Sequence, residues 1–299
     1  MNIIWAGYIF AIISSMFSAI YVVPKKFSKQ KPNTYAMVMG VGYFITAGMG
    51  FMLLTAFNFI DEPLFFPEVI IACINGVVWT VGSVSVLNAI DRIGLAKSNQ
   101  WKSLQGPIGA VLMLIILSEF LTTNVLFIIL AAVFITLAAM MVSTREKDNR
   151  PTDKAGIAYA LNAALFYGIA ALLNKYLTDQ GMLFAQQLYK ALFIFISAGV
   201  YTLVKYKGIK IEGASIKKEI ALPLTGGLLY FGNATFSILA YSLIDGSIAF
   251  MMHQLNAIWL FFLGVFLFRE IDFKKYSRRL VIGLVCSAIG VVMLVLAGA

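Results

Sequence analysis

The stretch Asn99-Gln100-Trp101-Lys102-Ser103-Leu104-Gln105-Gly106-Pro107 is a polar interruption in a hydrophobic segment that continues to Leu117. Amides, a lysine and a Gly-Pro pair stand here next to a long apolar run. A lysine at membrane depth costs at least ~2.5–3.5 kcal/mol on insertion scales, so it indicates a functional residue. Proline removes a backbone N–H and frees the carbonyl four residues earlier, so we expect Gly106 and Pro107 to form a hinge.

A second polar stretch, Met252-His253-Gln254-Leu255-Asn256-Ala257, lies in a later apolar segment. A shift of 151 residues aligns three pairs of side chains: Lys102 with His253, Gln105 with Asn256, and Glu119 with Glu270. The shared order indicates a duplicated unit whose two copies share one polar centre. We expect the two glutamates to lie at the membrane interface and to bind helix ends or basic loops.

The composition is that of a polytopic membrane protein. Of the 299 residues, 61% are hydrophobic and 12% are charged, and the mean hydropathy is +0.88. Soluble domains are about half apolar and about a quarter charged. The net charge of +9 resides in short loops, where it signals membrane topology rather than nucleic-acid binding. The two cysteines, Cys73 and Cys286, lie in apolar runs and predict no disulfide framework.

Ten segments are long and apolar enough to cross a bilayer, which takes ~20 residues. They are residues 3–23, 35–58, 65–87, 94–117, 121–142, 155–177, 183–204, 218–243, 246–268 and 276–298. Lysine and arginine are concentrated in the connections after the first, fifth, seventh and ninth segments, and acidic residues prevail in those after the even-numbered segments. The positive-inside rule places the basic connections in the cytoplasm. We therefore predict a multi-pass protein of the cell membrane with both termini outside.

A polar connection divides the chain into two halves. We predict one five-helix repeat in residues 1–144, a cytoplasmic loop in 145–154, and a second five-helix repeat in 155–299. Because five is odd, the halves must cross the membrane in opposite directions, which makes the fold an all-α pair of inverted repeats. In such proteins the ligand site lies near the midplane, between the repeats.

The polar residues at membrane depth define a candidate site. Those on corresponding helical stripes of the two polar stretches are predicted to line it: Lys102, Gln105, His253 and Asn256. Residues expected nearby are Trp79, Trp101 and Asn233. Amide side chains that hydrogen-bond hydroxyls, with an aromatic face against C–H groups, suit a sugar or another small polar solute.

Several of these polar residues also have a structural interpretation. Asn75 and Asn162 are more often interhelical hydrogen-bonding groups, worth ~0.6 kcal/mol, than ligand contacts. For Lys190, snorkelling to the interface and a place in the site stay equally open. His253 and Lys102 are the candidates for proton coupling, because no carboxylate is found at mid-membrane depth. Attraction of an anionic ligand is the alternative role for these two bases.

Motifs of other protein classes are absent from the sequence. There is no Walker-type phosphate loop, which argues against an ATP-driven pump. One histidine and two separated cysteines form no zinc motif, and no nucleophile–base constellation is visible. We therefore predict neither an enzyme, nor a cofactor, nor a metal site.

Three stretches carry a family resemblance: Gly76-Val77-Val78-Trp79-Thr80-Val81-Gly82, Leu104-Gln105-Gly106 through Glu119, and Gly232-Asn233 with Gln254-Leu255 and Glu270. They resemble the glucose/ribose porter family of bacterial sugar uptake proteins and its rhamnose-transporter relatives, in the drug/metabolite transporter superfamily. The resemblance implies a ten-helix secondary carrier. Such a carrier takes up monosaccharides with protons while two inverted bundles rock against each other.

Some alternatives stay open at this stage. Lys102 and His253 make the centre more basic than a neutral sugar requires, so a sugar acid, a sugar phosphate or another organic anion remains a candidate. An exporter of the same fold, and a receptor that binds without transport, are the competing functions. The expected partners are a small-molecule substrate and the lipid bilayer, without nucleic acid, and a homodimer is left open.

Overall fold

The computed structural model describes residues 2–93, 95–142, 153–208, 215–267 and 273–298, together with Ile211 and Gly213. Most of the predicted connection 145–154 lies outside the described residues, as does Glu270. The described part is helical and contains no strand. Its helices are α1 (Asn2–Ile20), α2 (Val23–Phe27), α3 (Pro32–Ala56), α4 (Val69–Ile93), α5 (Leu95–Lys102), α6 (Gln105–Ile116), η1 (Glu119–Leu121), α7 (Val125–Val142), α8 (Lys154–Asp179), α9 (Ala185–Tyr206), α10 (Ile216–Tyr241), α11 (Gly246–His253), α12 (Asn256–Phe262), η2 (Leu263–Leu267, a π-helical turn) and α13 (Phe273–Ala297).

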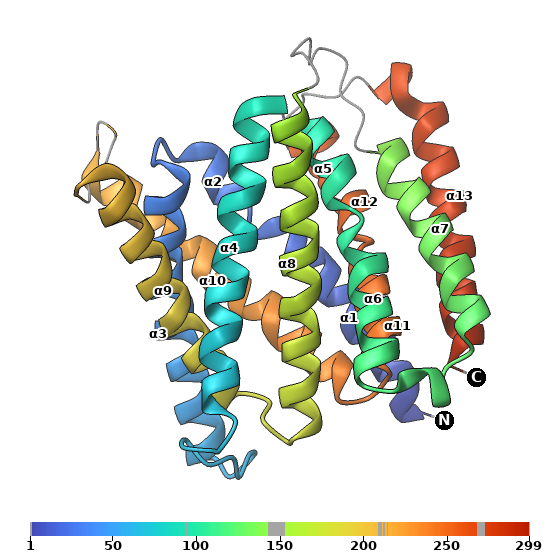
Figure 1. Cartoon of the computed structure of the whole chain (residues 1–299), viewed down its shortest axis with the longest axis horizontal. Helices are drawn as coiled ribbons and strands as arrows, with labels where there is room; N and C mark the ends of the chain where they lie inside the picture. The colour runs from blue at the N-terminus through green and yellow to red at the C-terminus, as the bar shows by residue number, and fades with distance from the viewer. Residues whose placement is uncertain are drawn as a thin grey trace.

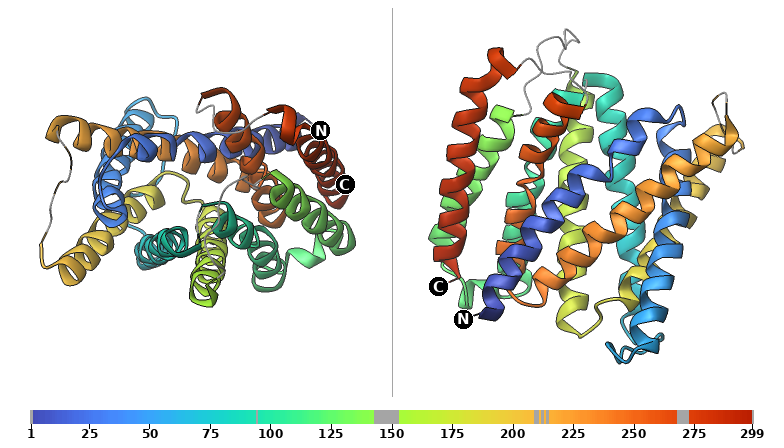
Figure 2. Two further views of the ribbon diagram at one scale, coloured as in Figure 1. Left: turned by 90° about the horizontal axis from the view of Figure 1, so that it is seen from above. Right: turned by 180° about the vertical axis from the view of Figure 1, so that it is seen from behind.

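Most helices run side by side in one bundle (Figure 1). Seen from behind, α1 and α10 cross the bundle diagonally next to each other (Figure 2). The N- and C-termini lie at the same end of the bundle. The end of α7 at Val142 and the start of α8 at Lys154 lie at the other end, so the connection between the halves starts and finishes opposite the termini.

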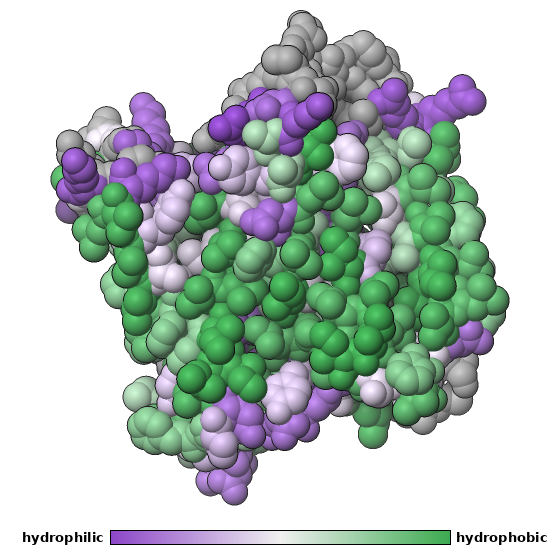
Figure 3. Space-filling model, viewed as in Figure 1, coloured by the Kyte–Doolittle hydropathy of each residue, from purple (hydrophilic) through white to green (hydrophobic). Residues whose placement is uncertain are grey.

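A hydrophobic band crosses the middle of the bundle on the face shown in Figure 3. Hydrophilic residues gather at both ends of that face (Figure 3). Among the described residues, seven helical segments are long and apolar enough to span a membrane: Ile3–Phe27, Pro32–Ala56, Val69–Ile90, Lys154–Asp179, Ala185–Lys205, Gly246–Leu267 and Ser277–Ala297. The protein is therefore a multi-pass helical membrane protein. Helices also occupy the other three predicted segments, but the number of crossings, ten, remains a prediction.

Both predicted polar stretches interrupt a helix. The chain leaves helical geometry at Ser103 and Leu104, between α5 and α6, and again at Gln254 and Leu255, between α11 and α12. The first break precedes the Gly-Pro pair that we predicted as the hinge. Pro107 is the third residue of α6, where a missing N–H costs no helical hydrogen bond.

Close helix contacts bring the two halves of the chain together. α4 packs against α8 and α9, α10 packs against α1 and α3, and α7 packs against α13. At the contact of α3 with α10, a Cβ atom on Gly42 would lie 2.5 Å from the carbonyl oxygen of Leu224. Only glycine permits this approach, so the two backbones pack nearly in contact.

Carboxylates fasten helix ends across the two halves. Buried Glu119 accepts hydrogen bonds from the backbone N–H groups of Gly246 (2.7 Å) and Ser247 (2.8 Å) at the start of α11, which confirms the role predicted for it. Glu62 accepts from two backbone N–H groups at the start of α9. Asp153 caps α8, and a hydrogen bond from Arg92 at 2.8 Å lowers the pKa of its carboxyl.

Candidate functional site

A pocket lies where the two helix breaks face each other. It contains about 610 Å³ of space between atoms, part of it open to solvent. The space within it that water-sized spheres can occupy is about 80 Å³, less than the ~300–1,000 Å³ of typical ligand sites. The residues that line this central pocket come from both halves of the chain: Ser18, Tyr21, Trp79, Lys102, Gln105, Tyr167, Ala170, Ala171, Asn174, Lys190, Tyr230, Asn233, Ala234, Ser237, Tyr241, Phe250, His253 and Asn256.

The structure brings six of the seven predicted site residues into this pocket. They are Lys102, Gln105, His253, Asn256, Trp79 and Asn233. Trp101 is not among the lining residues, and 38% of its side chain is exposed. It precedes Lys102 on α5, and neighbouring helical residues point about 100° apart. When Lys102 faces the pocket, Trp101 therefore faces away from it.

The two helix breaks are joined to each other by a pair of glutamines. Gln105 donates from Nε2 to Oε1 of Gln254 at 2.8 Å, and both side chains are buried. Gln254 in turn donates to the carbonyl of Phe250 at 3.0 Å. A Cβ atom on Gly106 would lie 2.6 Å from Cγ of Gln254, so glycine permits this contact. A hydrogen bond between the first and the second half of the chain thus joins the two breaks.

Serines of α1 hold the polar residues of the second half. Ser14 Oγ lies 2.9 Å from Nδ1 of His253, 3.1 Å from Oδ1 of Asn233 and 2.6 Å from Oγ of Ser237. Asn256 donates to Ser18 Oγ at 3.1 Å. Our sequence analysis missed these serines, although they recur four residues apart in an otherwise apolar helix.

Aromatic rings form one wall of the pocket. The ring centroids of Trp79 and Tyr230 lie 5.1 Å apart, those of Tyr21 and Tyr230 also 5.1 Å, and those of Trp79 and Tyr167 6.1 Å. These rings offer flat apolar faces, and the tyrosines add hydroxyl groups to the polar lining. A ligand with both C–H faces and hydroxyls finds a partner for each here.

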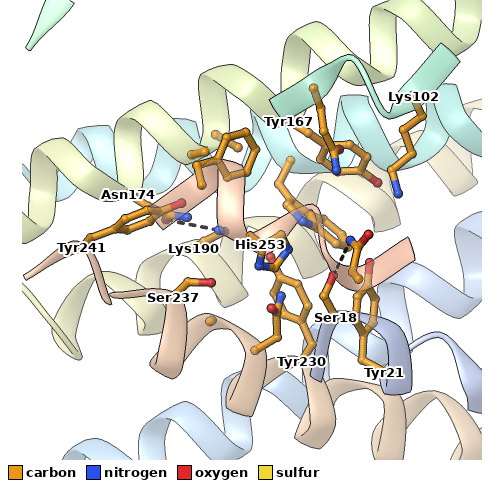
Figure 4. Close-up of a pocket in the computed structure, with 18 residues that line it drawn as sticks. Ser18, Tyr21, Lys102, Tyr167, Asn174, Lys190, Tyr230, Ser237, Tyr241 and His253 are labelled. Carbon is orange, nitrogen blue, oxygen red and sulfur yellow. Dashed lines mark hydrogen bonds between the residues drawn. The ribbon is translucent and has the colours of Figure 1, made fainter. Parts of the chain in front are cut away.

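Two amines reach the pocket from different helices (Figure 4). Lys102 Nζ lies 5.6 Å from the ring centroid of Tyr167. Lys190 is buried, with 3% of its surface exposed; its Nζ lies 3.2 Å from Oδ1 of Asn174 and 5.9 Å from the ring centroid of Tyr230. The Lys190 side chain therefore does not extend to the membrane interface. Of the two interpretations that the sequence left open, the structure favours a position in the pocket.

Two other polar residues have the structural role that their positions predict. Asn75 donates to Asn174 at 2.6 Å, and Asn162 donates to Ser85 at 2.8 Å, in each case between α4 and α8. Within the described ranges, no group of three or more His, Cys, Asp or Glu residues could hold a metal ion. Cys73 and Cys286 are free thiols.

Comparison with known proteins adds a family. Residues 9–297 match a family model described as "Sugar transport protein". A curated relative, "Probable glucose uptake protein GlcU" of Priestia megaterium, is 23% identical over 246 residues, which are 79% of this chain and 80% of that protein. A solved crystal structure superposes with a TM-score of 0.73 over 97% of both chains. The two sequences are 11% identical, so the similarity concerns the fold alone.

Proposed function

Because the chain belongs to the sugar transport protein family, we propose that it is a secondary carrier that imports a monosaccharide through the central pocket. The observation that carries this proposal is the composition of the pocket wall. Amides such as Asn233 and Asn256 line it together with aromatic rings such as Trp79 and Tyr230, a combination that suits the hydroxyls and C–H faces of a sugar ring. The name of the relative GlcU, a glucose uptake protein, supports the same substrate class.

We infer that import proceeds by alternating access between two inverted five-helix repeats. In support, the helix contacts pair up when the halves are exchanged. Matching α1 with α8, α4 with α10, α5 with α11 and α6 with α12 turns the contact of α4 with α8 into that of α10 with α1. It also turns the contacts of α5 and α6 with α8 into those of α11 and α12 with α1. Both broken helices then lie on the interface that would open and close.

The proposed orientation has both termini outside the cell membrane. The basic loops of the sequence argue for it, and so do the positions of the chain ends. The termini lie together at one end of the bundle, and the ends of α7 and α8 lie at the other. The basic connection 145–154 would then be cytoplasmic.

For proton coupling, His253 and Lys102 are the proposed groups. His253 lies in the pocket, and Ser14 fixes one of its ring nitrogens. Histidine is the side chain whose charge changes near neutral pH. A proton bound to His253 would therefore be in the same pocket as the bound substrate.

Counterflow in proteoliposomes tests the proposal. Liposomes loaded with unlabelled sugar receive labelled D-glucose, D-ribose, L-rhamnose or their acid and phosphate analogues outside. A carrier accumulates the label transiently, whereas a receptor binds it without exchange. Protein-free liposomes are the control. If no sugar of either kind exchanges, the assignment as a sugar carrier fails. Outward accumulation driven by a proton gradient would instead favour an exporter of the same fold.

A further inference from the structure

We propose that the monosaccharide of the central pocket is an anionic one, a sugar acid or sugar phosphate, whose negative group binds the amines of Lys102 and Lys190. The inference rests on the proposed function and narrows its substrate class. It starts from the charges that line the pocket. Two amines and an imidazole are present, and none of the lining residues is an aspartate or a glutamate.

The partners of the two amines are neutral. Lys190 donates to the amide oxygen of Asn174 and lies near the ring of Tyr230. Lys102 lies near the ring of Tyr167. Within the part of the chain that the structure describes, neither lysine forms an ion pair. An ammonium group at membrane depth is normally paired, so both amines here lack the counter-charge that would compensate their desolvation.

Another buried lysine, which does not line the pocket, provides a comparison with Lys102 and Lys190. Lys175 on α8 is 8% exposed. Its Nζ contacts Oδ1 of Asp179 at 2.7 Å and donates to the carbonyl of Tyr241 at 2.9 Å. This lysine has its own carboxylate one helical turn away. Lys102 and Lys190 have none, and they differ from Lys175 in facing the pocket.

The acidic groups at the nearby ends of the helices already have other partners. Glu119 binds the backbone N–H groups that begin α11. Asp245 accepts from Thr122 and Thr123, and Asp179 pairs with Lys175. These carboxylates are therefore committed to helix ends and loops. Among the described residues none supplies a negative charge to the pocket, and an anionic ligand would supply it.

The rest of the pocket suits the sugar part of such a ligand. Asn233, His253 and Asn256 offer hydrogen bonds to hydroxyls, and Trp79 and Tyr230 offer ring faces. A carboxylate or phosphate would lie at the amines, and the ring would lie against the aromatic wall. Charged hydrogen bonds to an anion are stronger than neutral ones, so the amines would discriminate against a neutral sugar of the same size.

The test compares charged and neutral sugars in the same counterflow assay with the full chain. Labelled D-glucuronate and D-glucose 6-phosphate are compared with D-glucose and D-ribose. We expect at least one anion to exchange at least ten-fold faster than its neutral counterpart. Lys190→Gln and Lys102→Gln should each reduce this preference, and Lys190→Arg should retain it. Lys217→Gln, which removes an exposed lysine at the start of α10, is the matched control.

Each outcome decides one of the two proposals. Exchange of neutral sugars without the anions overturns the anionic substrate and leaves the sugar carrier standing. A preference for anions that is undiminished in both glutamine variants overturns the role of the lysines. The Lys190→Arg variant and the elution of each variant from a sizing column separate loss of charge from loss of folding. If no sugar exchanges, the proposed function fails as a whole.

Discussion

The substitution Glu119→Gln tests how the second broken helix is held in place. The buried carboxylate accepts hydrogen bonds from Gly246 N (2.7 Å) and Ser247 N (2.8 Å). Glutamine has one acceptor oxygen, and its NH₂ group would face a backbone donor. The change removes one hydrogen bond to a charged group, worth ~1.5–3 kcal/mol, and a negative charge at a helix N-terminus, worth ~0.3–1 kcal/mol. We expect a loss of about 2–4 kcal/mol.

Thermal unfolding of the purified protein in detergent measures this loss. In a large domain, 1 kcal/mol shifts the melting temperature by ~2–4 °C, so the variant should melt roughly 4–16 °C lower. The half-buried thiols of Cys73 and Cys286 can report unfolding through a thiol-reactive fluorophore. Asp61→Asn removes an exposed carboxylate and should shift the midpoint by less than ~2 °C. If the Glu119→Gln variant and the wild type have the same melting temperature, the hydrogen bonds of Glu119 do not stabilise α11.

Three further substitutions address the pocket. Lys102→Ala should abolish counterflow of the anionic sugar without affecting membrane insertion, because the amine faces the pocket; wild-type exchange would remove Lys102 from the site. His253→Gln should remove the pH dependence of sugar accumulation and retain exchange, because the amide cannot titrate; an unchanged pH profile would assign coupling to another group. Gln105→Leu should leave Gln254 Oε1 buried without its donor, which costs ~1–3 kcal/mol, and should lower the melting temperature by roughly 2–12 °C; an unchanged midpoint would show that the glutamine pair does not join the breaks.

The features that could be predicted from the sequence are those that repeat along the chain. Periodic hydrophobicity locates the helical segments, and the Gly-Pro pair predicts a hinge within three residues of the first break, at Ser103 and Leu104. The second break, at Gln254 and Leu255, was not predicted. The common shift also pairs Lys102 with His253, which the structure places in one pocket. These features depend on local pattern and on duplication, both of which can be read from one chain.

The features that escaped prediction depend on which way a side chain points and on what lies opposite. Ser14 and Ser18 are small residues in an apolar helix, and only the proximity of α10, α11 and α12 gives them partners. Lys190 could reach the interface or the pocket with the same side chain, and the position of Asn174 decides between them. Trp101 differs from Lys102 by one position, which is enough to turn it outward.

The two pocket lysines differ in their helical surroundings, and this predicts a difference in function. Lys102 is the last residue of α5, as His253 is of α11. A helix C-terminus carries about half a negative charge and stabilises a nearby cation by ~0.3–1 kcal/mol. Lys190 lies in the second turn of α9, nearer to its positive end, and has no such compensation. Lys190 therefore gains more from a substrate anion. Lys190→Gln should reduce the preference for glucuronate over glucose more than Lys102→Gln does in parallel counterflow assays, and the reverse order would show that the helix end does not compensate Lys102.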